Sequence, residues 1–134
     1  HLFMAWKAKM FNDEWVFEKL KQAPSPAEAK KLGRKVKKNG KEPFPVGEWN
    51  EQSYEIMKNI VRSKFLQNEG LKLQLLHAVV DEEGNPAPCT FAEVTKKDDR
   101  WGTGCELPAY LRKEDTGTNH LGKILTEVRN ELLT

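Results

Sequence analysis

Lys7 is the residue of this sequence whose surroundings point most directly to chemistry. If residues 1–11 form a helix, the side chains three and four positions away from Lys7 are all apolar, namely Phe3, Met4, Met10 and Phe11. A lysine on an apolar helix face loses hydration, which lowers its pKa and makes the neutral amine available as a nucleophile. The structural alternative is that the long side chain reaches the edge of the helix and leaves its charge in water.

Two carboxylates and a tryptophan form a second candidate cluster within residues 91–104. Glu93 ends a predicted strand, Asp98 lies in the loop that follows, and Trp101 comes three residues later. Carboxylates at a strand end and on an adjacent loop can meet in one pocket. There they suit general acid and base catalysis at a glycosidic bond, beside an aromatic wall for a planar base. Gly102 would let the backbone approach a ligand. A turn with solvated acids and a core tryptophan is the competing interpretation.

Two further positions have both a binding and a structural interpretation. Asn119 follows a glycine-containing loop and precedes the last predicted helix, whose N-terminus could bind a phosphate or could simply be capped by this residue. Trp49, at the start of the longest predicted helix, could stack on a ligand or anchor the core. The basic stretch from residue 30 to residue 41 is typical of a solvated surface, but it could also steer a phosphate-bearing substrate or DNA. It lacks an RRM, KH or zinc-finger pattern.

The elements that would position these residues are mostly helical. Apolar residues at helical spacing, together with capping signals, predict five helices, over residues 1–11, 14–23, 26–36, 49–68 and 120–132. The apolar segment 71–80 is either a last helical turn or the start of a strand. Residues 89–94 alternate well enough for one strand, and residues 110–117 are polar and irregular. The pattern therefore predicts five or six helices with little strand.

Composition bounds the class of protein. A chain of 134 residues can form one domain with a real core. Its net charge of +2 argues only weakly for nucleic acid, and no segment approaches the roughly 18 apolar residues of a membrane span. Cys89 and Cys105 lack metal-ligand spacing. A reduced pair is favoured over a disulfide, so we expect an intracellular protein, cytoplasmic or nuclear, with no metal and no cofactor.

Six segments in the same order resemble the NADAR family, also called YbiA-like. They are His-Leu-Phe-Met-Ala-Trp-Lys-Ala at 1–8, residues 25–34, Trp49 with Met57, residues 64–68, residues 93–104 and residues 119–129. The resemblance covers nearly the whole chain. It implies an α+β, mainly helical N-glycosidase domain with five to six helices and a few short strands.

The resemblance also implies a reaction, the hydrolysis of the bond between a ribose C1′ and an amine. One associated substrate is ADP-ribose attached to guanine, in a nucleotide or carried by DNA. The other is a ribosylamino-pyrimidine phosphate intermediate of riboflavin synthesis. Lys96 and Lys97 add positive charge to the active loop, which favours the substrate with more phosphate. A non-catalytic ADP-ribose-binding module is a further alternative, and no membrane partner is expected.

Site roles follow from the matching positions. The family lysine falls on Lys7, where it implies a Schiff base with C1′. Asp98 is then expected to be the acid/base, and Glu93 a second carboxylate that orients the substrate. The residues expected to bind the substrate are Trp49, Trp101, Gly102, Asn119 and His1. Family members carry a strand–loop segment with a glutamate before the position of His1, so residues 1–134 are expected to be a domain that lacks this N-terminal segment.

Overall fold

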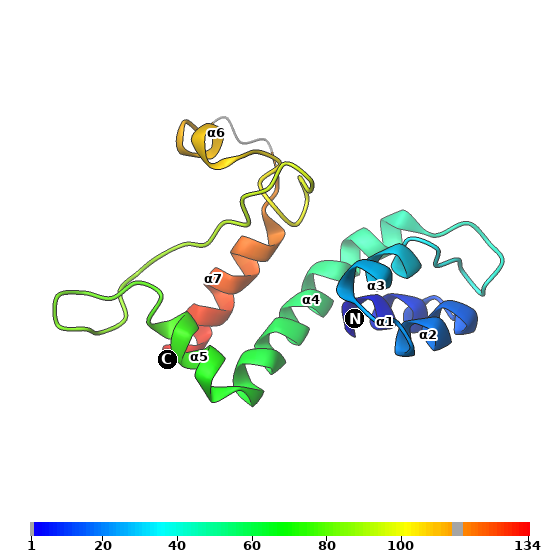
Figure 1. The fold of residues 1–134 in the computed structure, drawn as a ribbon, viewed down its shortest axis with the longest axis horizontal. Coiled ribbons are helices and arrows are strands. Elements are labelled where there is room, and N and C mark those ends of the chain that lie inside the picture. The colour runs from blue at the N-terminus through cyan, green and yellow to red at the C-terminus, as the bar shows by residue number, and fades with distance from the viewer. Residues whose placement is uncertain (1, 114–116) are drawn as a thin grey trace. The chain divides into compact units, whose positions relative to one another are not determined.

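The computed structural model describes residues 2–113 and 117–134, and the part of the chain that it describes forms seven helices (Figure 1). They are α1 (Leu2–Met10), α2 (Glu14–Lys21), α3 (Pro26–Gly33), α4 (Val46–Gln67), α5 (Glu69–Leu76), α6 (Leu107–Leu111) and α7 (His120–Leu132). The chain divides into two compact units, residues 1–60 and 61–134, so that α4 begins in the first and ends in the second.

The first unit is built from α1, α2, α3 and the start of α4. Predicted helix starts are confirmed here, because Asp13 accepts a hydrogen bond from the Val16 amide at 3.1 Å and Ser25 accepts one from the Glu28 amide at 3.2 Å. The apolar faces of these helices meet in one core, made of Ala8, Phe11, Val16, Leu20, Ala29, Val36 and Trp49. The neighbours of Lys7 on α1 therefore belong to this core: Ala8 is part of it, and the partly buried Phe3 and Met4 pack against it.

Asp13 also fixes the loop that follows α3. Its second carboxylate oxygen accepts a hydrogen bond from the Lys37 amide at 2.8 Å, and the Asn39 amide donates to the Phe11 carbonyl at 2.8 Å. Asp13 is only 4% exposed, so its carboxylate depends on these amides rather than on water for hydrogen bonds. The basic loop is thus tied to the junction of α1 and α2.

The second unit contains α5, α6, α7 and a long connection from residue 77 to residue 106. Arg129 of α7 is fully buried and donates hydrogen bonds to four backbone carbonyls, those of Leu75, Leu76, Val79 and Ala87, at 2.8 to 3.2 Å. These bonds join the C-terminal end of α5 and the following turn to α7.

The expected α+β fold is wrong. The described residues are 56% helix and 3% strand, and they contain no sheet. The segment 89–94, predicted as a strand, is irregular because side chains take its backbone groups. The Phe91 amide donates to Thr126 Oγ1 at 3.0 Å, and Asn119 accepts from the Glu93 amide at 2.9 Å. The segment therefore needs no partner strand, and the only pairing recorded in the described chain is two isolated bridges.

Three local predictions concern helices of the second unit. The ambiguous segment 71–80 begins as α5, which starts when Asn68 accepts a hydrogen bond from the Leu71 amide at 3.2 Å. A short α6 includes the first two residues of the stretch 110–117, which was predicted to be irregular; residues 112 and 113 form a turn, and 114–116 lie outside the described residues. The last helix starts where predicted, but Asn119 adopts a left-handed conformation, with φ of 53°, and makes no side-chain capping bond.

Among the helices described, none combines the length and hydrophobicity that crossing a bilayer requires.

Candidate active site

Lys7 lies in the middle of α1, in the first unit, and is half-buried. Its Nζ donates a hydrogen bond to the Gly33 carbonyl oxygen at 2.8 Å. Gly33 ends α3 and is itself buried, and a Cβ at this position would collide with the Met4 side chain. The absence of a side chain at Gly33 therefore lets the end of α3 approach α1 closely enough for its carbonyl to hold the amine.

Two aromatic rings complete the surroundings of the amine. Lys7 Nζ lies 4.4 Å from the centroid of the Phe44 ring and 5.8 Å from that of Trp49. Trp49 is 7% exposed and packs on Phe3 and Phe11, with ring centroids 5.0 Å and 6.3 Å apart. The structure thus places Trp49 in the core as a support for Lys7. Its contact with a substrate stays a prediction.

The pKa of Lys7 is lowered from its ordinary value, chiefly because burial removes water from the ammonium and secondly because Arg34 repels it. The ring faces and the Gly33 carbonyl stabilise the ammonium and act in the opposite direction. The net direction follows burial. A lysine with a lowered pKa holds a larger fraction of neutral amine near neutral pH, which is the form that attacks an electrophilic carbon. The geometry agrees with the apolar surroundings predicted from the sequence.

The loop between residues 93 and 104 belongs to the second unit, and Asp98 shapes it. One carboxylate oxygen of Asp98 accepts hydrogen bonds from the Arg100 amide at 2.9 Å and the Trp101 amide at 2.8 Å. This is the side-chain turn that aspartate commonly forms with the backbone two and three residues ahead. Asp98 therefore has a structural task in addition to its predicted acid/base role, and both of these hydrogen bonds use the same carboxylate oxygen.

Asn119 connects this loop to the last helix. Its amide nitrogen donates to the Phe91 carbonyl at 3.0 Å, and its oxygen accepts from the Glu93 amide at 2.9 Å. The Glu93 carbonyl accepts a further hydrogen bond from the Thr103 amide at 2.8 Å, while the Glu93 side chain is exposed. Glu93, Asp98 and Asn119 thus belong to one hydrogen-bonded framework.

Trp101 and Gly102 lie in the same framework. The Trp101 ring is 5.5 Å from the His120 ring and 5.5 Å from the Arg100 guanidinium. Gly102 is buried, and a Cβ there would meet the carbonyl oxygens of Glu93 and Asp98 at 2.7 and 2.9 Å. The close backbone approach that this glycine permits is therefore an approach to its own loop.

His120 stands beside the loop and was not singled out from the sequence. Its pKa is lowered, first by burial and then by the charges of Arg100 and Lys123, although Asp98 acts to raise it. The sequence signal that could have identified His120 is its position directly after Asn119, at the start of the last helix. Similarly, Phe44 escaped notice because it lies between two prolines, where no periodicity indicates burial.

The predicted site residues thus fall into two groups. Lys7 and Trp49 lie together in the first unit. The second unit holds Glu93, Asp98, Trp101, Gly102 and Asn119. His1 lies outside the described residues. Within residues 2–113 and 117–134, no group of three His, Cys, Asp or Glu side chains could hold a metal ion. Both cysteines are free thiols.

Comparison with known proteins gives a match over almost the full length. The family model described as NADAR domain matches residues 1–133. N-glycosidase R617 of Acanthamoeba polyphaga mimivirus is 31% identical over 131 residues, which is 96% of this chain and 69% of that protein. N-glycosidase YbiA of Escherichia coli K12 is 30% identical over 133 residues, covering 98% of this chain and 68% of that protein.

A third similar protein differs in name and in length. Riboflavin biosynthesis protein VVA0006 of Vibrio vulnificus YJ016 is 35% identical over 127 residues, which is 95% of this chain. The chain spans only 29% of that protein's length. The matching names support glycosyl hydrolysis at an N-glycosidic bond as the general class of activity.

Proposed function

This chain belongs to the NADAR family, and we propose that it is an N-glycosidase that removes ADP-ribose from ADP-ribosylated guanine, in a nucleotide or carried by DNA, through a Schiff base on Lys7. The observation that carries the proposal is the setting of Lys7. Its amine is half-buried beside two aromatic rings, is held by a backbone carbonyl, and has a lowered pKa. The exposed Lys9 and Lys21 also lie over an aromatic ring, so the feature that distinguishes Lys7 is its burial together with its bond to the Gly33 carbonyl.

The proposed reaction has two stages. The neutral Lys7 amine attacks C1′ while an acid protonates the departing guanine amine, so that the C1′–N bond to guanine breaks and, after Nζ loses a proton, a glycosylamine joins Lys7 to the sugar. The C1′–O4′ bond then breaks as O4′ takes a proton, and the opened sugar is held to Lys7 as an iminium. Water then adds to C1′, a proton passes to Nζ, and the bond from C1′ to Nζ breaks, which leaves an aldehyde at C1′ and restores the lysine. O4′ closes on that aldehyde, and ADP-ribose leaves. No oxidant, reductant or cofactor enters this balance. The enzyme contributes a poorly hydrated amine and a proton donor.

Asp98 is the proposed proton donor, with Glu93 as the second carboxylate, and the hydrogen bonds of Asp98 offer a clean test. An Asp98→Asn variant keeps an oxygen that can accept from the Arg100 and Trp101 amides, but it removes the acid. We expect kcat to fall about 10² to 10⁴-fold with an unchanged unfolding midpoint. Full activity in Asp98→Asn would show that this carboxylate serves only the turn. The rate is measured as release of ADP-ribose.

The substrate is tested by supplying two candidate substrates to the same preparation. We expect the whole chain to release ADP-ribose from ADP-ribosylated guanosine. Chromatography measures the ADP-ribose that is released. Equal enzyme is incubated in parallel with the ribosylamino-pyrimidine phosphate. Turnover of the pyrimidine compound alone would replace our substrate with the second candidate. Tight binding of ADP-ribose with no turnover of either compound would identify a binding module instead.

The second candidate substrate is kept because of one specific comparison. The Vibrio vulnificus relative, named as a riboflavin biosynthesis protein, is 35% identical to this chain. Both reactions break a bond between C1′ and an amine, and the proposed Schiff base would serve either. The two candidates therefore differ in how the remainder of the substrate is recognised, and not in the role given to Lys7.

A further inference from the structure

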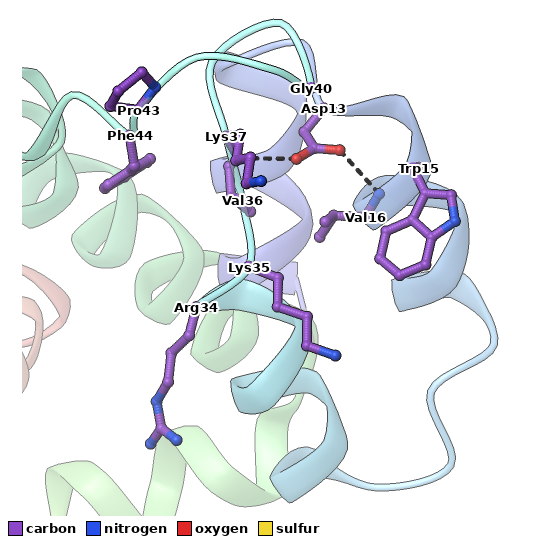
Figure 2. A pocket seen from close by; sticks show the side chains of 10 residues that line it. All are labelled: Asp13, Trp15, Val16, Arg34, Lys35, Val36, Lys37, Gly40, Pro43 and Phe44. Atoms are coloured by element: carbon purple, nitrogen blue, oxygen red, sulfur yellow. Dashed lines mark hydrogen bonds between the residues drawn. The ribbon is translucent and has the colours of Figure 1, made fainter.

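A hollow of about 510 Å³ in the first unit lies beside the loop that follows α3 (Figure 2). It is lined by three exposed cationic residues that lie close together in the sequence, Arg34, Lys35 and Lys37. Figure 2 shows their side chains leaving the same short segment of backbone. The hollow thus concentrates positive charge at one place on this unit.

No free carboxylate balances this charge within the hollow. Asp13 is the acidic residue that lines it, and its two oxygens accept hydrogen bonds from the Val16 and Lys37 amides (Figure 2). Among the described residues, none of the ion pairs involves Arg34, Lys35 or Lys37. Their charges are therefore available to an anion from solution.

The distribution of charge along the chain supports the same conclusion. Residues 30–41 contain seven of the 22 basic residues and no acidic one. The rest of the chain therefore holds fifteen basic and twenty acidic residues and is negative. A local excess of this size, in a protein with a net charge of only +2, attracts anions to one region. The hollow lies inside that region.

Phe44 links the hollow to the proposed nucleophile. The Phe44 side chain lines the hollow, and its ring centroid is 4.4 Å from Lys7 Nζ. Arg34 also lines the hollow and lies close enough to Lys7 to lower the lysine's pKa. Lys7 itself does not line the hollow, but Phe44 and Arg34 connect the two, so an anion bound there would lie near an electrophilic carbon at Lys7. In a ribosyl phosphate, the phosphate and C1 are likewise separated by a single sugar ring.

We propose that the phosphate or diphosphate of the ribosyl substrate binds in this hollow, where Lys35 and Lys37 hold its oxygens. The assignment rests on the proposed function, because it takes C1 of the same ribosyl group to react at Lys7. Charged donors suit phosphate oxygens. The exposed indole of Trp15, 58% accessible at the edge of the hollow, offers a surface for the part of the ligand beyond the phosphates.

The test compares two double variants of equal charge, in the whole chain, with inorganic pyrophosphate as the probe in calorimetry. Lys35→Gln/Lys37→Gln removes two lining cations. Lys30→Gln/Lys41→Gln removes two exposed cations from the same basic stretch that do not line the hollow. We expect the first pair to weaken pyrophosphate binding about tenfold or more, as the loss of charged hydrogen bonds predicts, and the second pair to change it less than about threefold.

Kinetics provide the second measurement. On the substrate that is turned over, the lining pair should raise KM with little change in kcat, because the phosphates stay bound throughout the reaction. Equal losses in both double variants, or binding of a single-stranded oligonucleotide with no binding of pyrophosphate, would overturn the subsite. Pyrophosphate binding that depends on Lys35 and Lys37, without sugar release from any substrate, would sustain the anion site and refute the proposed glycosidase.

Discussion

The Lys7→Ala variant is expected to release no measurable ADP-ribose, with kcat lowered on the order of 10³-fold or more, because it removes the atom that bonds to C1′. Borohydride added during turnover should reduce the iminium and leave a stable adduct on the unaltered chain. Mass spectrometry of peptides should find that adduct on Lys7. The same treatment of Lys7→Ala should give none.

The controls separate the nucleophile from the charge and from the fold. Lys7→Arg keeps a cation beside Phe44 and Trp49 but cannot form an imine, so it should be as inactive as the alanine variant. Lys9→Ala removes an exposed lysine from the same helix and should keep full activity. An adduct that persists in Lys7→Ala, or activity that survives in Lys7→Arg, would disprove the Schiff base.

The same lysine should govern the pH dependence. The reacting form is the neutral amine, so kcat/KM rises with pH until Lys7 is deprotonated. Because the pKa of Lys7 is lowered, this rise should be complete at lower pH than for an ordinary lysine. Arg34→Gln removes one cause of the lowering, so its profile should move to higher pH. Burial, the larger cause of the lowered pKa, remains in that variant. The midpoint of its pH profile should therefore still lie at lower pH than expected for a free lysine.

Local signals in the sequence were sufficient for several helix boundaries in both units. Ser25 caps α3 where the pattern predicts it, and Asn68 caps α5 at the predicted end of the long helix. Each of these signals involves residues only three or four positions apart, so it can be recognised in the sequence itself. The predicted strand over residues 89–94 failed because its backbone partners are Asn119 and Thr126, more than twenty residues away. Alternation of residue types does not reveal such partners.

The candidate site shows the same division. The apolar neighbours of Lys7 on its own helix were predictable from their spacing. The carbonyl of Gly33 and the ring of Phe44 reach Lys7 through tertiary packing, and no local pattern indicates either contact. For Asp98 the sequence left a turn and a catalytic acid as alternatives. The turn exists, and because one carboxylate can accept two amide hydrogen bonds with one oxygen, it does not exclude the acid.

Arg129→Met is expected to destabilise the second unit by about 1 to 3 kcal/mol or more, because a buried carbonyl that loses its donor costs about that much. Arg129 is fully buried and binds four backbone carbonyls, whereas methionine fills similar space without any donor. The carbonyls of Leu75 and Leu76, at the end of α5, would lose their bonds to α7. Arg129→Lys should lose less, because it keeps the charge but cannot reach all four carbonyls.

Hydrogen exchange measures this loss amide by amide, so it reports on each of the two units separately. Amides of α5 and α7 should exchange faster in Arg129→Met, whereas those of α1 to α3 should be unchanged. Lys123→Met, an exposed change on the same helix, should alter stability by less than about 0.5 kcal/mol. Unchanged protection in α5 would contradict the linking role of Arg129. Faster exchange throughout the chain would show that the two units unfold together, so that loss of Arg129 would then also disturb Lys7.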